Sequence, residues 1–375
     1  MLLVLVLAGL AAALGLAFVT QAPNRLVTGR GVPLQALLQG ARAAVLLPAL
    51  FVALGAFLRP APRTQLMVAA AASLLMAGLL WLAGDYAGRL SGGEESSART
   101  SFGGGFWVLL VLAWLAAADA LQRLRLSLAG RTLAGAAVLA PLAVLAALGL
   151  LDNLSLFKEY QNRQEVFDAA LLRHLEIVAA TLAASLAIGV PLGLVAFRRP
   201  SGAAPMFALL NLVQTIPSIA LFGLLIAPLA LISAALPWLG LRGIGFAPAI
   251  IALTLYSLLP IVQSTVTGLR QVPAAVVEAA TGMGMTTRQV FWQVEVPLAL
   301  PLLLSGLRIS TVQAVGLAVV AALIGAGGLG AIMFQGLLSS AIDLVLLGVL
   351  PVIAMAVAAD AALAVLADVM RKETG

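Results

Sequence analysis

The sequence has no cysteine, a single histidine and very little charge. Of its 375 residues, 62% are hydrophobic, 10% are charged and 6% are aromatic. The missing cysteines exclude a disulfide framework, and one histidine excludes a Cys/His metal site. A soluble domain carries about 25% charged residues. This composition therefore indicates a polytopic membrane protein whose surroundings are the lipid bilayer.

Catalytic signatures are missing as well. The sequence contains no Walker A phosphate-binding loop, no clustered pair of carboxylates and no nucleophile beside a base. We therefore expect no enzyme activity, no metal and no cofactor in this chain. The net charge of +6 does not indicate nucleic acid as a partner, because Lys and Arg in a membrane protein mainly mark the loops that face the cytoplasm.

Apolar runs of bilayer-spanning length recur along the chain. A helix crosses the hydrocarbon core in about 20 apolar residues. The first run has no basic residues ahead of a short apolar core, as a signal peptide would, so we expect it to be a span. The predicted fold class is an all-α membrane protein of about ten transmembrane helices, in the segments Leu2–Val19, Ala43–Leu58, Leu66–Ala83, Phe106–Leu121, Thr132–Leu150, Leu175–Phe197, Met206–Leu229, Ala247–Gly268, Leu302–Ile324 and Ile342–Leu366.

Basic residues with few acidic neighbours fall at every second connection. The other connections, 84–105 and 152–177, mix acidic with basic residues. Because cytoplasmic loops carry the excess of Lys and Arg, both termini are predicted to be cytoplasmic. The loop that holds Arg25, Arg30 and Arg42 fits this topology worst. The basic groups are Arg59/Arg63, Arg123/Arg125/Arg131, Arg198/Arg199, Arg270/Arg288 and Arg371/Lys372.

The chain divides into two halves around a polar segment. Residues 1–151 form five predicted spans made mostly of Leu, Ala, Val and Gly. Residues 152–173 are predicted to be a polar external loop. Residues 174–375 form five further spans, rich in polar and helix-breaking residues, with a cytoplasmic loop at 269–300. No clear repeat relates the halves, which argues against an inverted-repeat secondary transporter.

The loop at 269–300 has the signals of an ordered element. Pro273 suits the start of a helix, and Gly282 and Gly284 suit its end by taking positive φ. A capping box of Thr286 and Gln289 begins a second short helix. We expect this second helix to end before two prolines, 297 and 301, which prevent its simple continuation. An amphipathic hairpin lying on the lipid headgroups is the alternative interpretation.

The spacing within this loop decides between these interpretations. The stretch "EAATGMG", followed ten residues later by "VEVP", resembles the EAA loop of ABC-importer permeases. Valine stands in this chain where the family more often has Ile and Leu. The residues that match the family's pattern are Glu278, Ala279, Ala280, Gly284, Val294, Val296 and Pro297.

Three further stretches, 211–225, 243–269 and 321–337, are similar to the osmoprotectant branch of that family. That branch imports glycine betaine, choline, carnitine or proline betaine. The similarity runs from His174 to the C-terminus, so the first five spans are an N-terminal extension on the usual permease core.

The resemblance implies a type I permease core in a bacterial inner membrane. Two cytoplasmic ATPase subunits would bind and hydrolyse ATP, an external binding protein would deliver the substrate, and a second permease subunit, identical or paralogous, would complete the pathway. Glu278 would bond to its own loop or to a basic residue of the ATPase. The expected ATPase-coupling residues are Glu278, Ala279, Ala280, Gly282, Gly284 and Pro297.

Polar residues within the later spans are candidates for the translocation pathway. Interhelical hydrogen bonding is the commoner use of such side chains in membranes, and it remains the alternative for each. Aromatic faces usually hold quaternary ammonium groups, and their scarcity here predicts that the binding protein sets most of the selectivity. The pathway candidates are Gln214, Thr215, Pro217, Ser218, Tyr256 and Gln263.

Two acidic residues in predicted spans support a different hypothesis, an ion-coupled secondary transporter that uses Asp119 or Asp360. Arg123 follows Asp119 closely, which favours a solvated ion pair over a proton relay. The sequence identifies no partner for Asp360. His174 is expected in a loop or at an interface. A membrane-embedded enzyme would need a cluster of His, Asp, Glu and Arg at one membrane face, and one histidine does not provide it.

Overall fold

The computed structural model describes residues 1–375 except 25–26, 28, 91–97, 240–242 and 374–375. The chain forms two units, 1–162 and 163–375. Within the described residues, eight helices are long and apolar enough to cross a membrane, and these helices carry the predicted all-α architecture.

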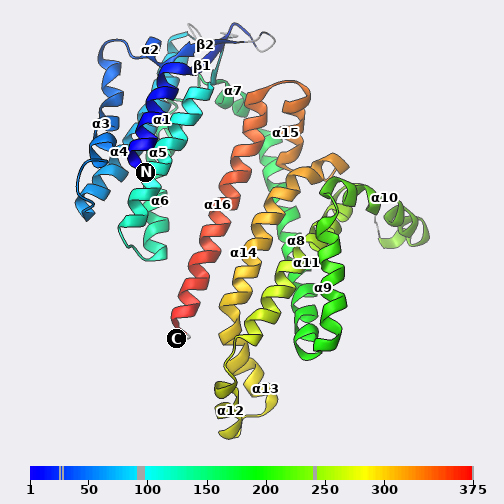
Figure 1. Ribbon diagram of the computed structural model, residues 1–375. Coiled ribbons are helices and arrows are strands. Elements are labelled where there is room, and N and C mark those ends of the chain that lie inside the picture. The colour runs from blue at the N-terminus through cyan, green and yellow to red at the C-terminus, as the bar shows by residue number, and fades with distance from the viewer. Residues whose placement is uncertain (25–26, 28, 91–97, 240–242, 374–375) are drawn as a thin grey trace. The chain divides into compact units, whose positions relative to one another are not determined.

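The N-terminal unit is a group of helices joined to a small sheet (Figure 1). Two long helices, α4 and α5, pack side by side, and α1, α3 and α6 pack against this pair. The helices are α1 (Leu2–Gly15), α2 (Leu34–Leu37), a 3₁₀ helix (Gly40–Leu46), α3 (Leu47–Gly55), α4 (Pro62–Leu90), α5 (Gly104–Arg123), α6 (Leu128–Ala147) and α7 (Ser155–Gln161); the strands are β1 (Ala17–Ala22), β2 (Arg30–Pro33) and β3 (Arg99–Phe102).

The three-stranded antiparallel sheet was not predicted. Its strand order is β2-β1-β3, and Thr20 lies opposite both Gly31 and Ser101. The aromatic and β-branched residues of "AFVTQA" suit an extended strand, so α1 ends at Gly15 and the predicted span over 2–19 is too long. Pairing of β1 with β3 brings the loop after α1 and the loop before α5 to one end of the unit, as the predicted topology requires.

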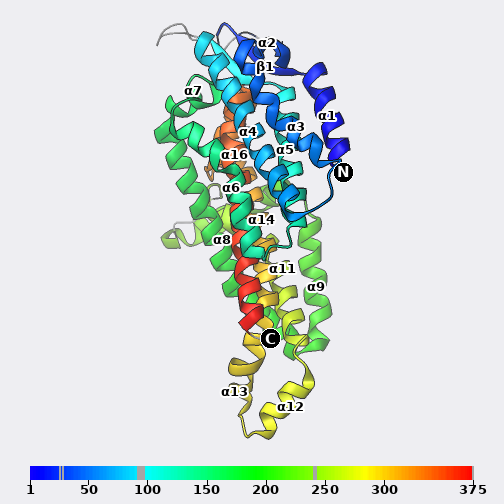
Figure 2. The same cartoon turned by 90° about the vertical axis from the view of Figure 1, so that its left-hand side faces the viewer.

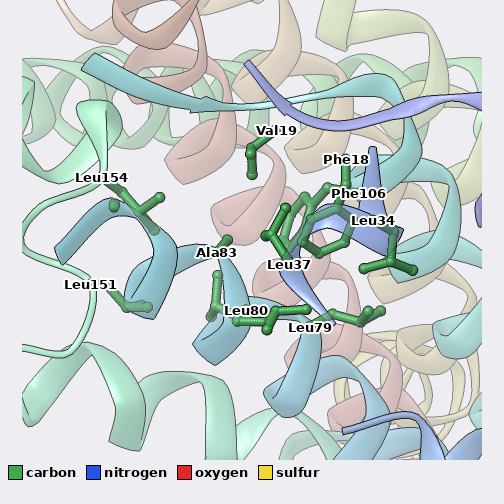
Figure 3. Close-up of a cluster of buried hydrophobic side chains, with 12 residues drawn as sticks. Phe18, Val19, Leu34, Leu37, Leu79, Leu80, Ala83, Phe106, Leu151 and Leu154 are labelled. Carbon is green, nitrogen blue, oxygen red and sulfur yellow. The ribbon is translucent and has the colours of Figure 1, made fainter. Parts of the chain in front are cut away.

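Large apolar side chains form the core beneath the sheet (Figure 3). Phe18 and Val19 of β1 are completely buried, and Phe106 at the start of α5 is 1% exposed. The rings of Phe18 and Phe106 meet edge to face at 5.7 Å, and Phe102 stacks on Phe106 at 4.1 Å. Leucines from α2, α4 and the segment before α7 complete the cluster.

The C-terminal unit is built around four long helices (Figures 1 and 2). Helix α11 packs between α8 and α14, and α14 packs against α16. The elements are α8 (Gln164–Arg198), α9 (Pro200–Thr215), α10 (Ser218–Ala235), a 3₁₀ turn (Pro237–Leu239), α11 (Phe246–Arg270), α12 (Ala274–Gly282), α13 (Thr287–Val290), a π turn (Phe291–Glu295), α14 (Val296–Val320), a 3₁₀ turn (Ala321–Ile324), α15 (Leu329–Leu338) and α16 (Ile342–Glu373).

Small residues bring these helices together. On α8, Gly189 and Gly193 face α11 so closely that an added Cβ would lie 2.8 Å from Ile261 and 2.6 Å from Thr265. A Cβ on Gly306 of α14 would collide with Ser264 of α11. Close approach of backbones at small residues is the usual way that helices associate in lipid.

Four of the predicted segments need correction. The first two spans correspond to apolar helices of only 14 and 16 residues, Leu2–Gly15 and Gly40–Gly55. The predicted span 206–229 is split at Pro217 into α9 and α10. The predicted loop 152–173 is largely helical. Helix α8 begins at Gln164, because residues 164–173 contain strong helix formers and neither Gly nor Pro.

Candidate functional site

The segment between α11 and α14 forms a helical hairpin that extends past the ends of both helices (Figures 1 and 2). Helix α12 begins directly after Pro273 and ends at Gly282, as predicted. Gly284 then takes φ +86°, and the Met285 N–H donates to the Ala280 carbonyl at 3.2 Å, which closes the helix end. Gly282 stays helical, so the prediction of positive φ there was wrong.

The second arm of the hairpin starts with the predicted capping box. The Gln289 N–H donates to Thr286 Oγ1 at 3.4 Å, and the Thr286 N–H donates to Gln289 Oε1 at 2.8 Å. The predicted proline break is wrong, because the chain continues through a π turn into α14. Pro297 would clash with the carbonyl four residues earlier in a regular helix. The π turn widens the backbone there, which places Pro297 in the tolerant first turn of α14.

The hairpin buries one side and leaves the other open. Ala280 and Val290 are only 3% and 4% exposed, and α12 packs there against α13 and the π turn. Met283 is 78% exposed and Trp292 60% exposed. Ala279 and Glu278 are exposed as well. The hairpin is thus an ordered element that presents apolar side chains without a covering element of its own unit.

Glu278 has no hydrogen bond or ion pair with any residue that the structure describes. The side chain of Glu278 is exposed on α12. Glu278 lies beyond the first turn of this helix, and that turn contains no acidic residue. The local bond expected between this carboxylate and its own loop is therefore not formed. Its charge remains available to a basic group outside the chain.

Among the pathway candidates, Gln214 and Tyr256 meet. Pro260 has no N–H for the Tyr256 carbonyl of α11, and Gln214 Nε2 donates to this free carbonyl instead. The Tyr256 hydroxyl in turn donates to the Ile216 carbonyl, where the chain breaks before Pro217. Each of the two interrupted helices thus supplies a hydrogen-bond donor to a free carbonyl of the other. Gln214 and Tyr256 therefore make interhelical hydrogen bonds, which was the alternative to lining the pathway.

The other pathway candidates lie apart from this exchange. Thr215 is exposed and donates to the Leu212 carbonyl at 2.7 Å, so it serves its own helix end. Pro217 caps α10, and the half-buried Ser218 begins it. Gln263 is exposed further along α11 and makes no hydrogen bond to the Gln214–Tyr256 pair. The structure brings together two of the six candidates.

A charged pair that sequence reasoning missed lies in the same unit. Arg308 of α14 donates from both Nε and Nη2 to the two carboxylate oxygens of Asp360 on α16. The partners are 52 residues apart, and no local pattern links them. Their shared position near the middle of two spans was the available signal, since charges at that depth are paired. A hydrogen bond of 3.4 Å from Gln313 Nε2 to Gln214 Oε1 links α14 to α9 nearby.

The remaining acidic candidate and the histidine have structural surroundings. Asp119 forms an ion pair with Arg123, with contacts of 2.8 and 3.2 Å, as expected. His174 is fully buried in α8, and its Nε2 lies 3.1 Å from the Val315 carbonyl. The expectation of a loop or interface position was therefore wrong, because α8 starts ten residues before the histidine.

Comparison with known proteins finds similar proteins for both parts of this chain. A model of the N-terminal domain of ABC transporter permease YehY matches residues 1–157. The chain is 42% identical over 192 residues to the osmoprotectant import permease protein OsmW of Salmonella typhimurium, covering 50% of this chain and 84% of that protein. It is 36% identical to the choline transport system permease protein OpuBB of Bacillus subtilis, covering 51% and 82%.

A third relative and a solved structure complete the comparison. The glycine betaine/carnitine/choline transport system permease protein OpuCB of Bacillus subtilis is 36% identical, with 51% of this chain and 82% of that protein covered. The MetNI methionine ABC transporter in an inward-facing conformation is 24% identical with a TM-score of 0.46, covering 54% of this chain and 96% of that chain. A family model matches residues 185–372, so the chain belongs to the family of binding-protein-dependent transport system inner membrane components.

Proposed function

We propose that this chain is the membrane-spanning subunit of an ATP-driven importer of quaternary-amine osmoprotectants such as glycine betaine or choline. The relatives named for osmoprotectant, choline and carnitine transport support this substrate class, and each matches about half of this chain. The observation that carries the mechanism is the ordered hairpin with its exposed apolar face. Such an element transmits the closure of a partner to the helices on which it is built.

The proposed partners follow from the parts that an importer needs. A cytoplasmic dimer of ATPase subunits binds ATP and receives the hairpin, with Glu278, Ala279, Ala280, Gly282, Gly284 and Pro297 as the coupling set. An external binding protein delivers the solute, and a second permease subunit faces this one. The complex lies in a bacterial inner membrane, and the hairpin and both termini are on the cytoplasmic side.

The ion-coupled alternative is weakened by the ion pairs. Asp119 and Asp360 each bond to an arginine, so both carboxylates already serve as partners of a fixed positive charge. Uptake that requires ATP and persists in the presence of an uncoupler distinguishes the importer from the ion-coupled transporter.

The two glycines of the hairpin provide a matched test of coupling. Gly284 has φ +86°, and Gly282 is helical, while an added Cβ meets nothing within 4 Å at either position. Gly284→Ala therefore strains the turn by about 1–2 kcal/mol, and Gly282→Ala does not. In vesicles with the ATPase and binding protein, we expect Gly284→Ala to lower uptake per ATP hydrolysed more than Gly282→Ala, which adds a methyl group to the coupling set but leaves the backbone unstrained. Equal coupling in both variants would contradict the role of the hairpin.

A further inference from the structure

The ion pair of Arg308 and Asp360 lies at the middle of its helices. Arg308 is twelve residues from Val296 and twelve from Val320, the two ends of α14, so it lies about 18 Å along the axis from each end. Asp360 lies in the interior of α16, 13 residues before its last residue, Glu373. Neither side chain reaches a membrane surface by extending along its helix, as charged residues near helix ends do.

The pair is open to one side. The Arg308 side chain is 44% exposed and that of Asp360 is 37% exposed. A groove of about 500 Å³ runs along them and is lined by Ser305, Arg308, Ile309, Val312, Gln313 and Asp360. Charged groups in the middle of a membrane face a bundle interior or a water-filled passage and avoid lipid. This face of α14 is therefore a candidate for lining the solute pathway.

We propose that the Arg308–Asp360 pair is a transit site for zwitterionic quaternary amines, which carry a fixed positive charge and a carboxylate. This inference rests on the proposed function. The solute carboxylate would take the place of Asp360 on the guanidinium, which binds carboxylates through two parallel N–H donors. The quaternary ammonium group has no N–H to donate, and it would lie against the Asp360 carboxylate as a plain charge.

Charge balance explains the preference for zwitterions. A zwitterion exchanges one ion pair for two, so neither protein charge is left unpaired in the middle of the membrane. A solute with only the positive charge would occupy Asp360 and leave Arg308 unpaired. Glycine betaine should therefore pass this point more readily than choline, which has a hydroxyl in place of the carboxylate. The site must also bind weakly, because a conducting site has to release what it receives.

Glycine betaine and choline serve as the probes in vesicles that contain the whole transporter. For Arg308→Gln, we expect the ratio of glycine betaine uptake to choline uptake to fall at least about tenfold from the wild-type ratio, as for the loss of a charged hydrogen-bonding partner. Asp360→Asn should lower the uptake of both solutes, since both would need that carboxylate. Arg308→Lys, which keeps the charge, should restore much of the wild-type ratio.

Assembly is checked by the ATP hydrolysis that the binding protein stimulates. Should Arg308→Gln fail to assemble because Asp360 is left unpaired, the double variant R308Q/D360N removes both charges and should show the same loss of preference. An unchanged uptake ratio in the assembled variants would overturn the transit site and would show a structural pair. Absence of ATP-dependent uptake of either solute by the wild type would instead refute the proposed function.

Discussion

The two units of the chain differ in the side chains that fill their cores. In the N-terminal unit, the aromatic rings of Phe18, Phe102 and Phe106 meet under a sheet and fill the core with large side chains. In the C-terminal unit, the closest helix contacts are made by glycines, such as Gly193 on α8 and Gly306 on α14. Close contacts at glycines also occur in the first unit, where a Cβ on Gly55 of α3 would lie 2.3 Å from Val68 of α4. The contrast between the units therefore lies in the aromatic cluster of the first.

The units also differ in where their ion pairs lie along the helices. Asp85 and Asp119 of the N-terminal unit pair with arginines near the last turns of α4 and α5. Arg308 and Asp360 of the C-terminal unit pair near the middle of their helices. An arginine or aspartate at a helix centre costs about 2.5–3.5 kcal/mol to insert. The C-terminal unit bears this cost at Arg308 and Asp360, the two residues of the proposed transit site.

Small residues and polar groups in the C-terminal unit depend on each other. Gly306 lets α14 lie close to α11 at Ser264, and one turn later Ser310 Oγ donates to the Ser257 carbonyl at 3.2 Å. Leucine side chains would hold the helices further apart and leave these polar atoms without partners. Because lipid tails are as apolar as leucine, bulk alone adds little attraction between helices there.

The largest effect is expected from removing bulk in the N-terminal core. Phe106 is 1% exposed and Phe57 is 76% exposed. Phe106→Ala should lower the free energy of unfolding by about 3–5 kcal/mol, while Phe57→Ala should leave it nearly unchanged. Thermal unfolding of the purified protein in detergent measures the difference. Equal stability of the two variants would mean that the aromatic cluster does not hold this unit together.

A smaller loss of stability is expected from the opposite change, adding bulk to the C-terminal core. A Cβ at position 306 would collide with Ser264 and lie 2.7 Å from the Pro260 carbonyl, whereas at Gly316 of the same helix it would meet nothing within 4 Å. Gly306→Val should therefore cost about 1–3 kcal/mol from overpacking. Gly316→Val introduces the same side chain into the same helix without the collision. Matching unfolding temperatures would show that α11 and α14 can separate freely.

Local chemistry explains what the sequence could predict. The hairpin follows from interactions within a few residues, such as the capping box of Thr286 and Gln289 and the turn at Gly284. The length of the apolar runs likewise predicted seven of the eight candidate spans, and the remaining one, Ser218–Ala235, only overlaps the predicted segment 206–229. The ATPase-coupling roles of the hairpin residues stay predictions, since they concern partners that bind from outside.

Long-range pairing explains what the sequence could not predict. Strand β1 pairs with β3 about 80 residues later, and Arg308 finds Asp360 on another helix. The prolines show the same limit. Pro260 lies inside α11, where a side chain of α9 supplies the missing donor, and Pro297 is accommodated by a π turn. A rule based on one residue type, such as the rule that proline breaks a helix, cannot account for a hydrogen-bond donor that comes from a distant segment.

The smallest effect is expected from filling an apolar cavity in the N-terminal unit. Gly9 of α1 lines an apolar cavity of about 270 Å³, and a Cβ there would lie 3.7 Å from Leu109 and 3.8 Å from Leu112. Gly9→Ala should raise the free energy of unfolding by about 0.5–1 kcal/mol, because alanine favours the helix and fills space. Gly223→Ala in α10, where a Cβ meets nothing within 4 Å, adds the helix preference alone.

The difference between these two alanine variants in thermal unfolding isolates the packing contribution of the cavity. A greater gain for Gly9→Ala would show that a glycine of the N-terminal unit is dispensable, unlike Gly306 of the C-terminal unit. A loss of stability in Gly9→Ala would contradict this contrast, because α1 would then depend on close approach, as α14 does. The comparison between the units thus depends on whether substitution of each glycine raises or lowers the free energy of unfolding.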